Sequence, residues 1–310
     1  MRILLHYPAW GNRWEPYIKE ALNEFDLTIT HTEDSAELGE LSLEADVLIS
    51  MWASGIVEFW SKYFSDKKIV TYLRRFELWQ PEFMTKIDWT KVDRTIFVSN
   101  WCRQAANMMW NSHHIKRPKE QIIIPNGVDF SDFELRQKKP DTKKIAFVCS
   151  LKEVKNVPLA FQILMELPKD YTLHHIGLPF SSQHTGQLYS YMHGLGLTDR
   201  FFSDGHIPRE KVADWLADKD YILSTSLNEG NPNNVIEAMA MGIKPVIHSW
   251  PGAREQFPED LIFDRVSGAV DLITGESYTP VSYRNWVLDR YNLSNFEKFK
   301  KVVEQLAEDQ

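Results

Sequence analysis

The stretch "DYILSTSLNEGNPNNVIEAMAMGIKPVIHS", residues 220–249, contains two short apolar runs separated by a helix-like run. The runs "DYILSTS" and "KPVIHS" have the length and the apolar, β-branched content of buried strands. Between them, "PNNVIEAMAMG" predicts a helix with Asn231 as N-cap and Pro232 at its first position. Gly242 ends this helix and Pro245 follows. A strand, a crossover helix and a second strand form the basic unit of a parallel α/β sheet.

The same alternation extends over the whole chain. Further strand-like runs, with helical stretches between several of them, are "RILLHY", "LTITHT", "ADVLISMW", "KKIVTYL", "RTIFVSN" and "QIIIPNG". The scheme restarts at Lys143 with the strand-like runs "KKIAFVCS" and "YTLHHIG", after the polar, linker-like stretch "FSDFELRQKKPDTKK". We therefore predict an α/β protein with two Rossmann-like parallel-sheet domains, residues 1–131 and 132–289, that face each other across a cleft. An amphipathic helix over 290–310 is expected to pack back on the first domain.

Composition excludes several classes of protein. The 310 residues are 43% hydrophobic and 13% aromatic, which is enough for well-packed cores. With 35 Lys and Arg against 43 Asp and Glu, the net charge of −8 argues against a broad nucleic-acid surface. Two cysteines make no disulfide framework, and no run reaches the ~20 apolar residues of a membrane span. We expect a cytoplasmic protein, with peripheral membrane contact through the aromatic stretch 52–64 as an alternative to core packing there.

Two carboxylates flank the predicted turn at Gly230. Glu229 and Glu237 stand eight positions apart, at the carboxyl end of a parallel strand and on the following helix. Open α/β sheets bind ligands at this edge, and the N–H groups of a helix start attract phosphate. Carboxylates would repel a phosphate unless they accept hydrogen bonds from hydroxyl groups of the same ligand. A nucleoside-diphosphate sugar carries hydroxyl-bearing rings on both sides of its diphosphate and meets both demands.

A diphosphate also requires a cation, and Lys155 is the candidate. It follows the strand "KKIAFVCS" and precedes Asn156, which is expected to cap the next helix. Because neighbouring parallel strands end at the same edge of a sheet, Lys155 and Glu229 are expected to face one site.

The chain resembles the GT-B glycosyltransferases of the large retaining family 4, the glycosyl transferases group 1. The resemblance rests on "IPNGVDFSDF" at 124–133, "SLKEVKN" at 150–156, "LGLTDRFFSDGHIPREKVADWL" at 195–216 and "EGNPNNVIEAMAMGIKPVI" at 229–247. It covers the chain well from about Asp93 to Gly252 and only in topology before that. The two glutamates alone are a weak signal, but their order and spacing relative to the other motifs make a strong one.

The resemblance implies a role for each matching residue. Glu237 would bind the ribose hydroxyls, Glu229 would hold the donor sugar near its anomeric carbon, and Lys155 would neutralise the diphosphate. The turn would contact the donor through the backbone of Gly230, Asn231, Pro232, Asn233 and Asn234. Such enzymes retain the anomeric configuration and need no metal or other cofactor, and the leaving phosphate oxygen is expected to deprotonate the acceptor. The donor substrate would be a UDP- or GDP-sugar.

The sequence departs from the family at three places. Ser150 stands where the family usually has an arginine, and the histidine often found in the first domain is replaced by Arg74 or Leu73, followed by Arg75. We hypothesise that Arg74, as a catalytic residue, or Arg75, as a donor ligand, supplies the lost positive charge from across the cleft. The first loop lacks paired glycines and keeps only Gly11 for donor contact.

Two other interpretations stay open at this point. Ser150 and the missing histidine would also suit a catalytically impaired protein of this fold that binds a nucleotide-sugar or regulates. Transfer of sugar to nucleic acid is weaker because of the net acidity. The acceptor stays unidentified: a glycan, a lipid-linked glycan or a small molecule would each fit. The spelling D-x-D at 218–220 is interpreted as a solvated helix end rather than a metal site.

Overall fold

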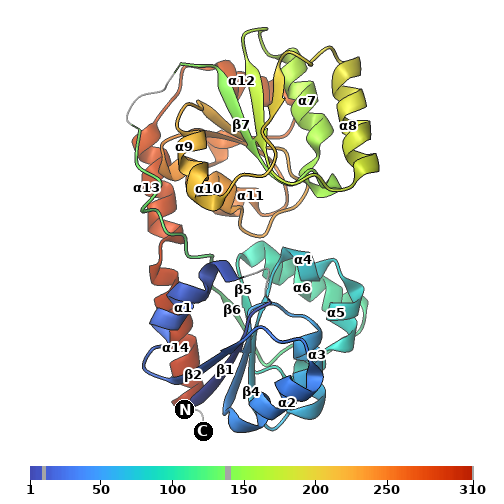
Figure 1. Ribbon diagram of the computed structural model, residues 1–310, viewed down its shortest axis with the longest axis vertical. Coiled ribbons are helices and arrows are strands. Elements are labelled where there is room, and N and C mark those ends of the chain that lie inside the picture. The colour runs from blue at the N-terminus through green and yellow to red at the C-terminus, as the bar shows by residue number, and fades with distance from the viewer. Residues whose placement is uncertain (9–11, 137–140, 309–310) are drawn as a thin grey trace. The chain divides into compact units, whose positions relative to one another are not determined.

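The computed structural model describes residues 1–8, 12–136 and 141–308, and it divides into two compact units. Unit 1 comprises Met1–Gly127 and Leu293–Gln310, and unit 2 comprises Val128–Asn292. Each unit contains a six-stranded parallel sheet with helices packed around it (Figure 1). None of the described helices is long and apolar enough to cross a membrane.

The sheet of unit 1 has the strand order β2-β1-β3-β4-β5-β6. Its strands are β1 (Arg2–His6), β2 (Asp26–Thr30), β3 (Val47–Ser50), β4 (Lys68–Leu73), β5 (Arg94–Phe97) and β6 (Glu120–Ile123). The helices are η1 (Asn12–Trp14), α1 (Glu15–Ala21), α2 (Ser35–Glu44), α3 (Gly55–Tyr63), α4 (Arg75–Leu78), α5 (Pro81–Lys86), η2 (Trp89–Lys91) and α6 (Asn100–Ser112). Every strand expected from the sequence is present. The central strands β3, β4 and β5 are buried on both faces of the sheet, whereas the edge strands β2 and β6 are partly exposed.

The last helix of the chain, α14 (Ser294–Glu308), belongs to unit 1. Its apolar face supplies Phe299 and Val303 to the core, both fully buried. Phe296 stacks on Tyr17 of α1, with ring centroids 5.6 Å apart. The buried Arg94 donates to the carbonyl of Val302 at 2.9 Å. The helical spacing of apolar residues in this segment thus gives one buried face, as the pattern predicts.

The sheet of unit 2 has the strand order β12-β11-β10-β7-β8-β9. Its strands are β7 (Lys144–Val148), β8 (Thr172–Ile176), β9 (Phe201–Ser203), β10 (Tyr221–Ser224), β11 (Lys244–His248) and β12 (Ile262–Phe263). The helices are η3 (Glu153–Lys155), α7 (Val157–Glu166), α8 (Ser182–Gly194), η4 (Arg209–Lys211), α9 (Val212–Leu216), α10 (Asn233–Ala240), α11 (Ala253–Gln256), η5 (Glu259–Leu261), α12 (Val266–Thr274) and α13 (Pro280–Tyr291). The strand, helix and strand predicted over residues 220–249 are present as β10, α10 and β11.

The predicted start of α10 is wrong in detail. The helix begins at Asn233 with Pro232 in the N-cap position, and no side chain caps it. Asn231 instead donates from its buried amide to Gln256 at 2.9 Å, which takes its side chain away from the helix start. The predicted end is confirmed, since Gly242 follows the helix with a φ of +78°, a conformation that glycine adopts without strain.

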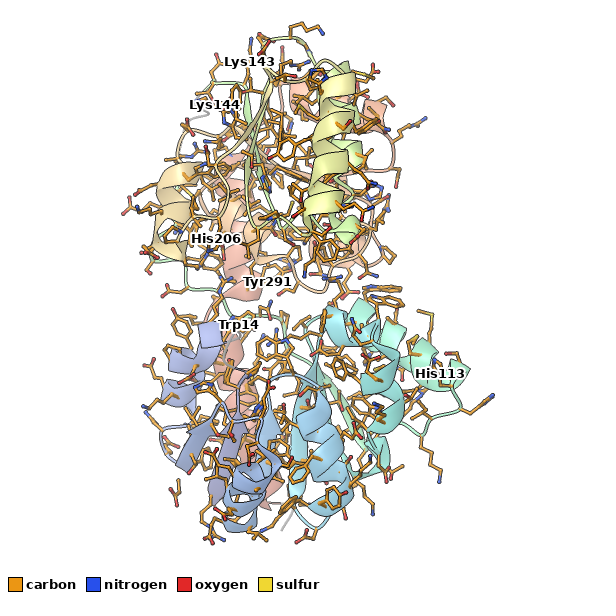
Figure 2. All side chains as sticks on the ribbon, turned by 45° about the vertical axis from the view of Figure 1, so that its right-hand side comes forward. Trp14, His113, Lys143, Lys144, His206 and Tyr291 are labelled. Atoms are coloured by element: carbon orange, nitrogen blue, oxygen red, sulfur yellow. The ribbon has the colours of Figure 1, made fainter. Side chains whose placement is uncertain are left out.

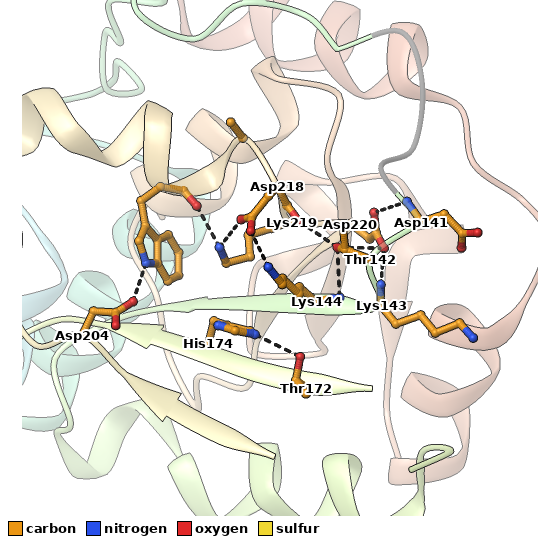
Figure 3. A network of polar contacts seen from close by, with 12 residues as sticks. Asp141, Thr142, Lys143, Lys144, Thr172, His174, Asp204, Asp218, Lys219 and Asp220 are labelled. Carbon is orange, nitrogen blue, oxygen red and sulfur yellow. Dashed lines mark hydrogen bonds and ion pairs between the residues drawn. The ribbon is translucent and has the colours of Figure 1, made fainter. Parts of the chain in front are cut away.

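The D-x-D stretch is not a solvated helix end. At the amino ends of β7 and β10, the fully buried Asp220 accepts from the backbone N–H of Asp141 at 3.0 Å and of Lys143 at 2.6 Å (Figure 3). Asp218 pairs with Lys144 at 2.6 Å and with Lys219. The described residues contain no group of three or more His, Cys, Asp or Glu side chains arranged to hold a metal ion. These carboxylates hold the amino ends of β7 and β10, at the edge of the sheet opposite the carboxyl ends of the strands.

Candidate functional site

The strand order of unit 2 places a topological switch point between β7 and β10. From β7 the chain proceeds through β8 to β9 on one side, and then returns to β10 on the other side of β7. Ligands of open α/β sheets bind where the strand order reverses, outside the carboxyl ends of the strands. The segments that follow β7 and β10 contain Lys155 and Glu229 respectively. Topology therefore brings these two residues to one place.

Lys155 and Glu229 form an ion pair at this switch point. The Lys155 Nζ lies 2.5 Å from Glu229 Oε1, and the two side chains are only 17% and 9% exposed. Ser226 donates to the same carboxylate oxygen at 2.7 Å. Thr225 binds the Lys155 carbonyl through its hydroxyl at 2.7 Å, which ties η3 to the end of β10. Both charges are therefore held in fixed positions before any ligand binds.

The backbone around Lys155 and the turn is also held by side chains. Asn156 occupies the N-cap position of α7 as predicted, but with a left-handed φ of +46° and without a side-chain cap. Gln256 donates to the carbonyl of Gly230 at 3.0 Å, and Asn234 donates to the carbonyl of Val148 at 2.7 Å. The amide of Asn234 thus links the first turn of α10 to the end of β7. Fixed backbone N–H groups at a helix start are a preorganised anion site.

Glu237 lies on α10 with its side chain 5% exposed. It forms an ion pair that the sequence patterns did not predict. Arg209 of η4 places Nη1 2.7 Å from Glu237 Oε2. The same guanidinium lies over the ring of Phe133, 5.1 Å from its centroid. Arg209 stands in "HIPREKVADWL", at the start of a helix after a strand, as Lys155 does. That position is the signal that could have identified it.

A cavity of about 350 Å³ opens beside the carboxyl ends of β7 and β8. Ser150, Gly177, His206 and Arg209 line it, together with apolar side chains. Figure 2 shows His206 in unit 2. Burial raises the pKa of Cys149, another lining residue, to about 12, so its thiol stays neutral. The cavity is therefore an apolar space with one cation, Arg209, at its wall.

The structure places Arg74 in a cage of aromatic rings within unit 1. Its guanidinium carbon lies 4.4 Å from the ring centroid of Trp14, which Figure 2 labels, and 4.9 Å from those of Trp52 and Tyr72. Its Nη1 donates to Asn126 Oδ1 at 2.7 Å. Rings and a hydrogen bond of its own unit therefore fix this cation just after β4.

Arg75 and Gly11 are the other two residues of unit 1 that were predicted to bind the donor. Arg75 is the first residue of α4 and is half-buried. Gly11 lies outside the described residues. The hypothesis that Arg74 or Arg75 replaces a phosphate cation stays a prediction, and turnover of Arg74→Ala and Arg75→Ala variants tests it.

A buried carboxyl group follows the Arg74 cage. Glu77 on α4 is 1% exposed, and burial raises its pKa from 4.5 to about 7. Between these two values the folded protein keeps a proton that the unfolded chain releases, so the free energy of unfolding falls as the pH rises through this window. We expect Glu77→Gln to be about 3 kcal/mol more stable than the wild type at pH 8, and equally stable at pH 4.5.

Urea denaturation at the two pH values measures the effect of Glu77→Gln. The matched control is Glu82→Gln, which changes an exposed residue of α5 and should leave stability unchanged at both pH values. Burial lowers the pKa of His6 to about 4, which makes stability rise with pH from about 4 to 6.5. That slope is common to wild type and variant and cancels in their difference. A gain from Glu77→Gln that is the same at both pH values would contradict the assignment.

Residues 130–262 match the family model named Glycosyl transferases group 1. The match covers fewer than half of the 310 residues, but it includes Lys155, Arg209, Glu229 and Glu237. This segment is a glycosyl transferases group 1 domain. No curated protein matches the chain.

The chain is also similar to solved structures over its whole length. Anabaena Alr3699/HepE in complex with UDP-glucose superposes with a TM-score of 0.80 at 15% identity, covering 99% of this chain and 100% of that one. Sucrose-phosphate synthase from Thermosynechococcus elongatus gives a TM-score of 0.75 at 12% identity, with 100% of both chains covered. The lipopolysaccharide outer core galactosyltransferase WaaB gives 0.70 at 16% identity, covering 98% and 99%.

The fold is GT-B. The predicted fold class, with two Rossmann-like parallel sheets, is thereby confirmed. At these identities the similarity establishes the GT-B fold alone, so the activity has to be argued from the site.

Proposed function

We propose that this protein is a retaining, metal-independent glycosyltransferase of family 4, which moves a sugar from a UDP- or GDP-sugar to an acceptor. The observation that carries the proposal is the preformed Lys155–Glu229 pair at the switch point, with Glu237 on the helix that follows. The Anabaena HepE structures of the same fold contain UDP and UDP-glucose, which supports a nucleotide-sugar donor here.

Each residue has a distinct task in this proposal. Lys155 has three N–H donors, so its ammonium group can hold Glu229 and a diphosphate oxygen together. Glu229, an acceptor-only group, would then orient the hydroxyls of the donor sugar near its anomeric carbon. The backbone N–H groups at the start of α10 would receive the remaining phosphate charge. The departing diphosphate would take the proton of the acceptor, and rate enhancement would come from positioning and from stabilising this leaving group.

Calorimetry with nucleotides and an assay of donor hydrolysis test the proposal. We expect UDP or GDP to bind the wild type, and one nucleotide-sugar of a panel to release free nucleotide slowly in the absence of acceptor. Failure of both UDP and GDP to bind would overturn the proposal. Binding without any release from the whole panel would instead favour the second candidate, a nucleotide-sugar-binding protein without turnover, for which Ser150 is the supporting observation.

We place the acceptor in unit 1, which also has a pocket at the carboxyl edge of its sheet. This pocket, of about 350 Å³, lies between the first turns of α2 and α3 and reaches α5. It combines the carboxylate of Glu33 and the hydroxyls of Ser35 and Ser54 with the rings of Phe59 and Phe83. Polar groups and aromatic rings lining one pocket suit a ligand with both hydroxyls and apolar surface, such as a glycan.

A further inference from the structure

The cavity beside β7 and β8 has a serine where a cation was expected, and a different residue supplies a positive charge. Ser150, which stands where the family usually has an arginine, lines this cavity, and so does Arg209. Ser150 follows β7 directly, whereas Arg209 comes from η4, beyond β9. The two positions are far apart in the chain, yet they face the same space. A positive charge is therefore present at the site, supplied from a different segment.

Arg209 has the exposure and geometry of a ligand-binding residue. Its side chain is 41% exposed, while its partner Glu237 is 5% exposed. One edge of the guanidinium binds Glu237 at 2.7 Å, and its face lies over Phe133. In the described part of the chain, no acceptor other than Glu237 receives a hydrogen bond or ion pair from this group. Since a guanidinium has five N–H donors in a planar fork, those directed away from Glu237 can bind an anion.

We propose that Arg209 binds the diphosphate of the donor and, with the same guanidinium, holds the Glu237 carboxylate in place for the ribose. This inference rests on the proposed function and identifies the second cation of the donor site beside Lys155. Bidentate contacts with phosphate oxygens are a preferred use of arginine. The cation–π contact with Phe133 keeps the guanidinium near the cavity when a ligand is absent.

A purely structural role for Arg209, as the partner of Glu237, makes a different prediction. If Arg209 acts only through Glu237, its loss should weaken uridine and UDP alike, because both carry the ribose. If Arg209 touches the diphosphate, its loss should weaken UDP much more than uridine. Calorimetric titration with the two ligands therefore separates the alternatives. GDP and guanosine replace them if the wild type prefers GDP.

The variants Arg209→Met, Arg209→Lys and Glu237→Gln, with the double variant Arg209→Met/Glu237→Gln, complete the test. We expect Arg209→Met to weaken UDP binding at least about tenfold and uridine binding less than about threefold, since hydrogen bonds to charged groups are strong. Arg209→Lys, which keeps the charge without the fork, should recover part of the loss. In the Glu237→Gln background, Arg209→Met should still weaken UDP about tenfold, because positioning of the carboxylate no longer matters there.

The outcomes are distinguishable from a failure of the proposed function. An equal loss for UDP and uridine, or no additional loss in the Glu237→Gln background, overturns the contact between Arg209 and diphosphate while the proposed function stands. A wild type that binds neither UDP nor GDP overturns the proposed function, and this inference with it. Thermal unfolding of each variant shows that it is folded. Arg209 is half-exposed, and the double variant leaves no buried carboxylate unpaired.

Discussion

Glu229→Gln is expected to reduce sugar transfer about a thousandfold while the affinity for UDP stays equal or rises. The substitution keeps the shape of the side chain and removes its charge, so the partly buried Lys155 loses its anionic partner at 2.5 Å. A buried ammonium without a partner gains more from a phosphate than one already paired. UDP lacks the sugar that Glu229 would orient, so its binding does not suffer. The rate of transfer falls, because the contact between Glu229 and the donor sugar is needed near the anomeric carbon.

Nucleotide release from the donor and calorimetry with UDP measure the two halves of the Glu229→Gln prediction. The matched control is Glu276→Gln, which makes the same change at an exposed position of unit 2 and should leave both quantities unchanged. Wild-type release by Glu229→Gln would remove Glu229 from the catalytic site. A parallel loss of UDP affinity would show that the glutamate holds Lys155 in place rather than the sugar.

Most strands of both units could be predicted from the sequence because each is an apolar run between turn residues. The two strands that the pattern missed, β9 and β12, lie at sheet edges and have three and two residues. Runs this short carry no periodicity, so their pairing with β8 and β11 decides their conformation. The placement of Lys155 and Glu229 at one site could be predicted as well, since both residues follow strands at the same edge, but their ion pair was not predicted.

The partners of the predicted residues could not be read from local patterns. Arg209 meets Glu237 because the topology of the sheet brings η4 and α10 together, although the two residues are far apart in the chain. Asn231 looks like a helix cap in the sequence, but Gln256, 25 positions later, takes its amide. In both cases a long-range contact overrides or adds to what neighbouring residues predict. The shape of the site therefore depends on topology more than on the motif itself.

Gly177→Ala is expected to be the most destabilising single substitution that we predict, with a loss of at least about 4 kcal/mol. Gly177 follows β8 with a φ of +149°, a conformation that residues with a side chain rarely adopt. A Cβ there would lie 1.8 Å from the carbonyl oxygen of Cys149 and 2.5 Å from its carbonyl carbon. Both are backbone atoms at the end of β7, so no rotamer change can relieve the overlap. Either β8 or β7 has to move.

Gly196→Ala separates the effect of overlap from that of backbone conformation. Gly196 also has a positive φ, +68°, but a Cβ there would meet nothing within 4 Å. We expect a loss of about 1 kcal/mol from the left-handed conformation alone. Urea denaturation of the two variants, followed by tryptophan fluorescence, compares them directly. Since Gly177 lines the same cavity as Arg209, Gly177→Ala should also lose UDP binding where it still folds, and Gly196→Ala should keep it. Equal stability of the two variants would mean that β7 and β8 can separate freely at this edge, which a preformed donor site does not allow.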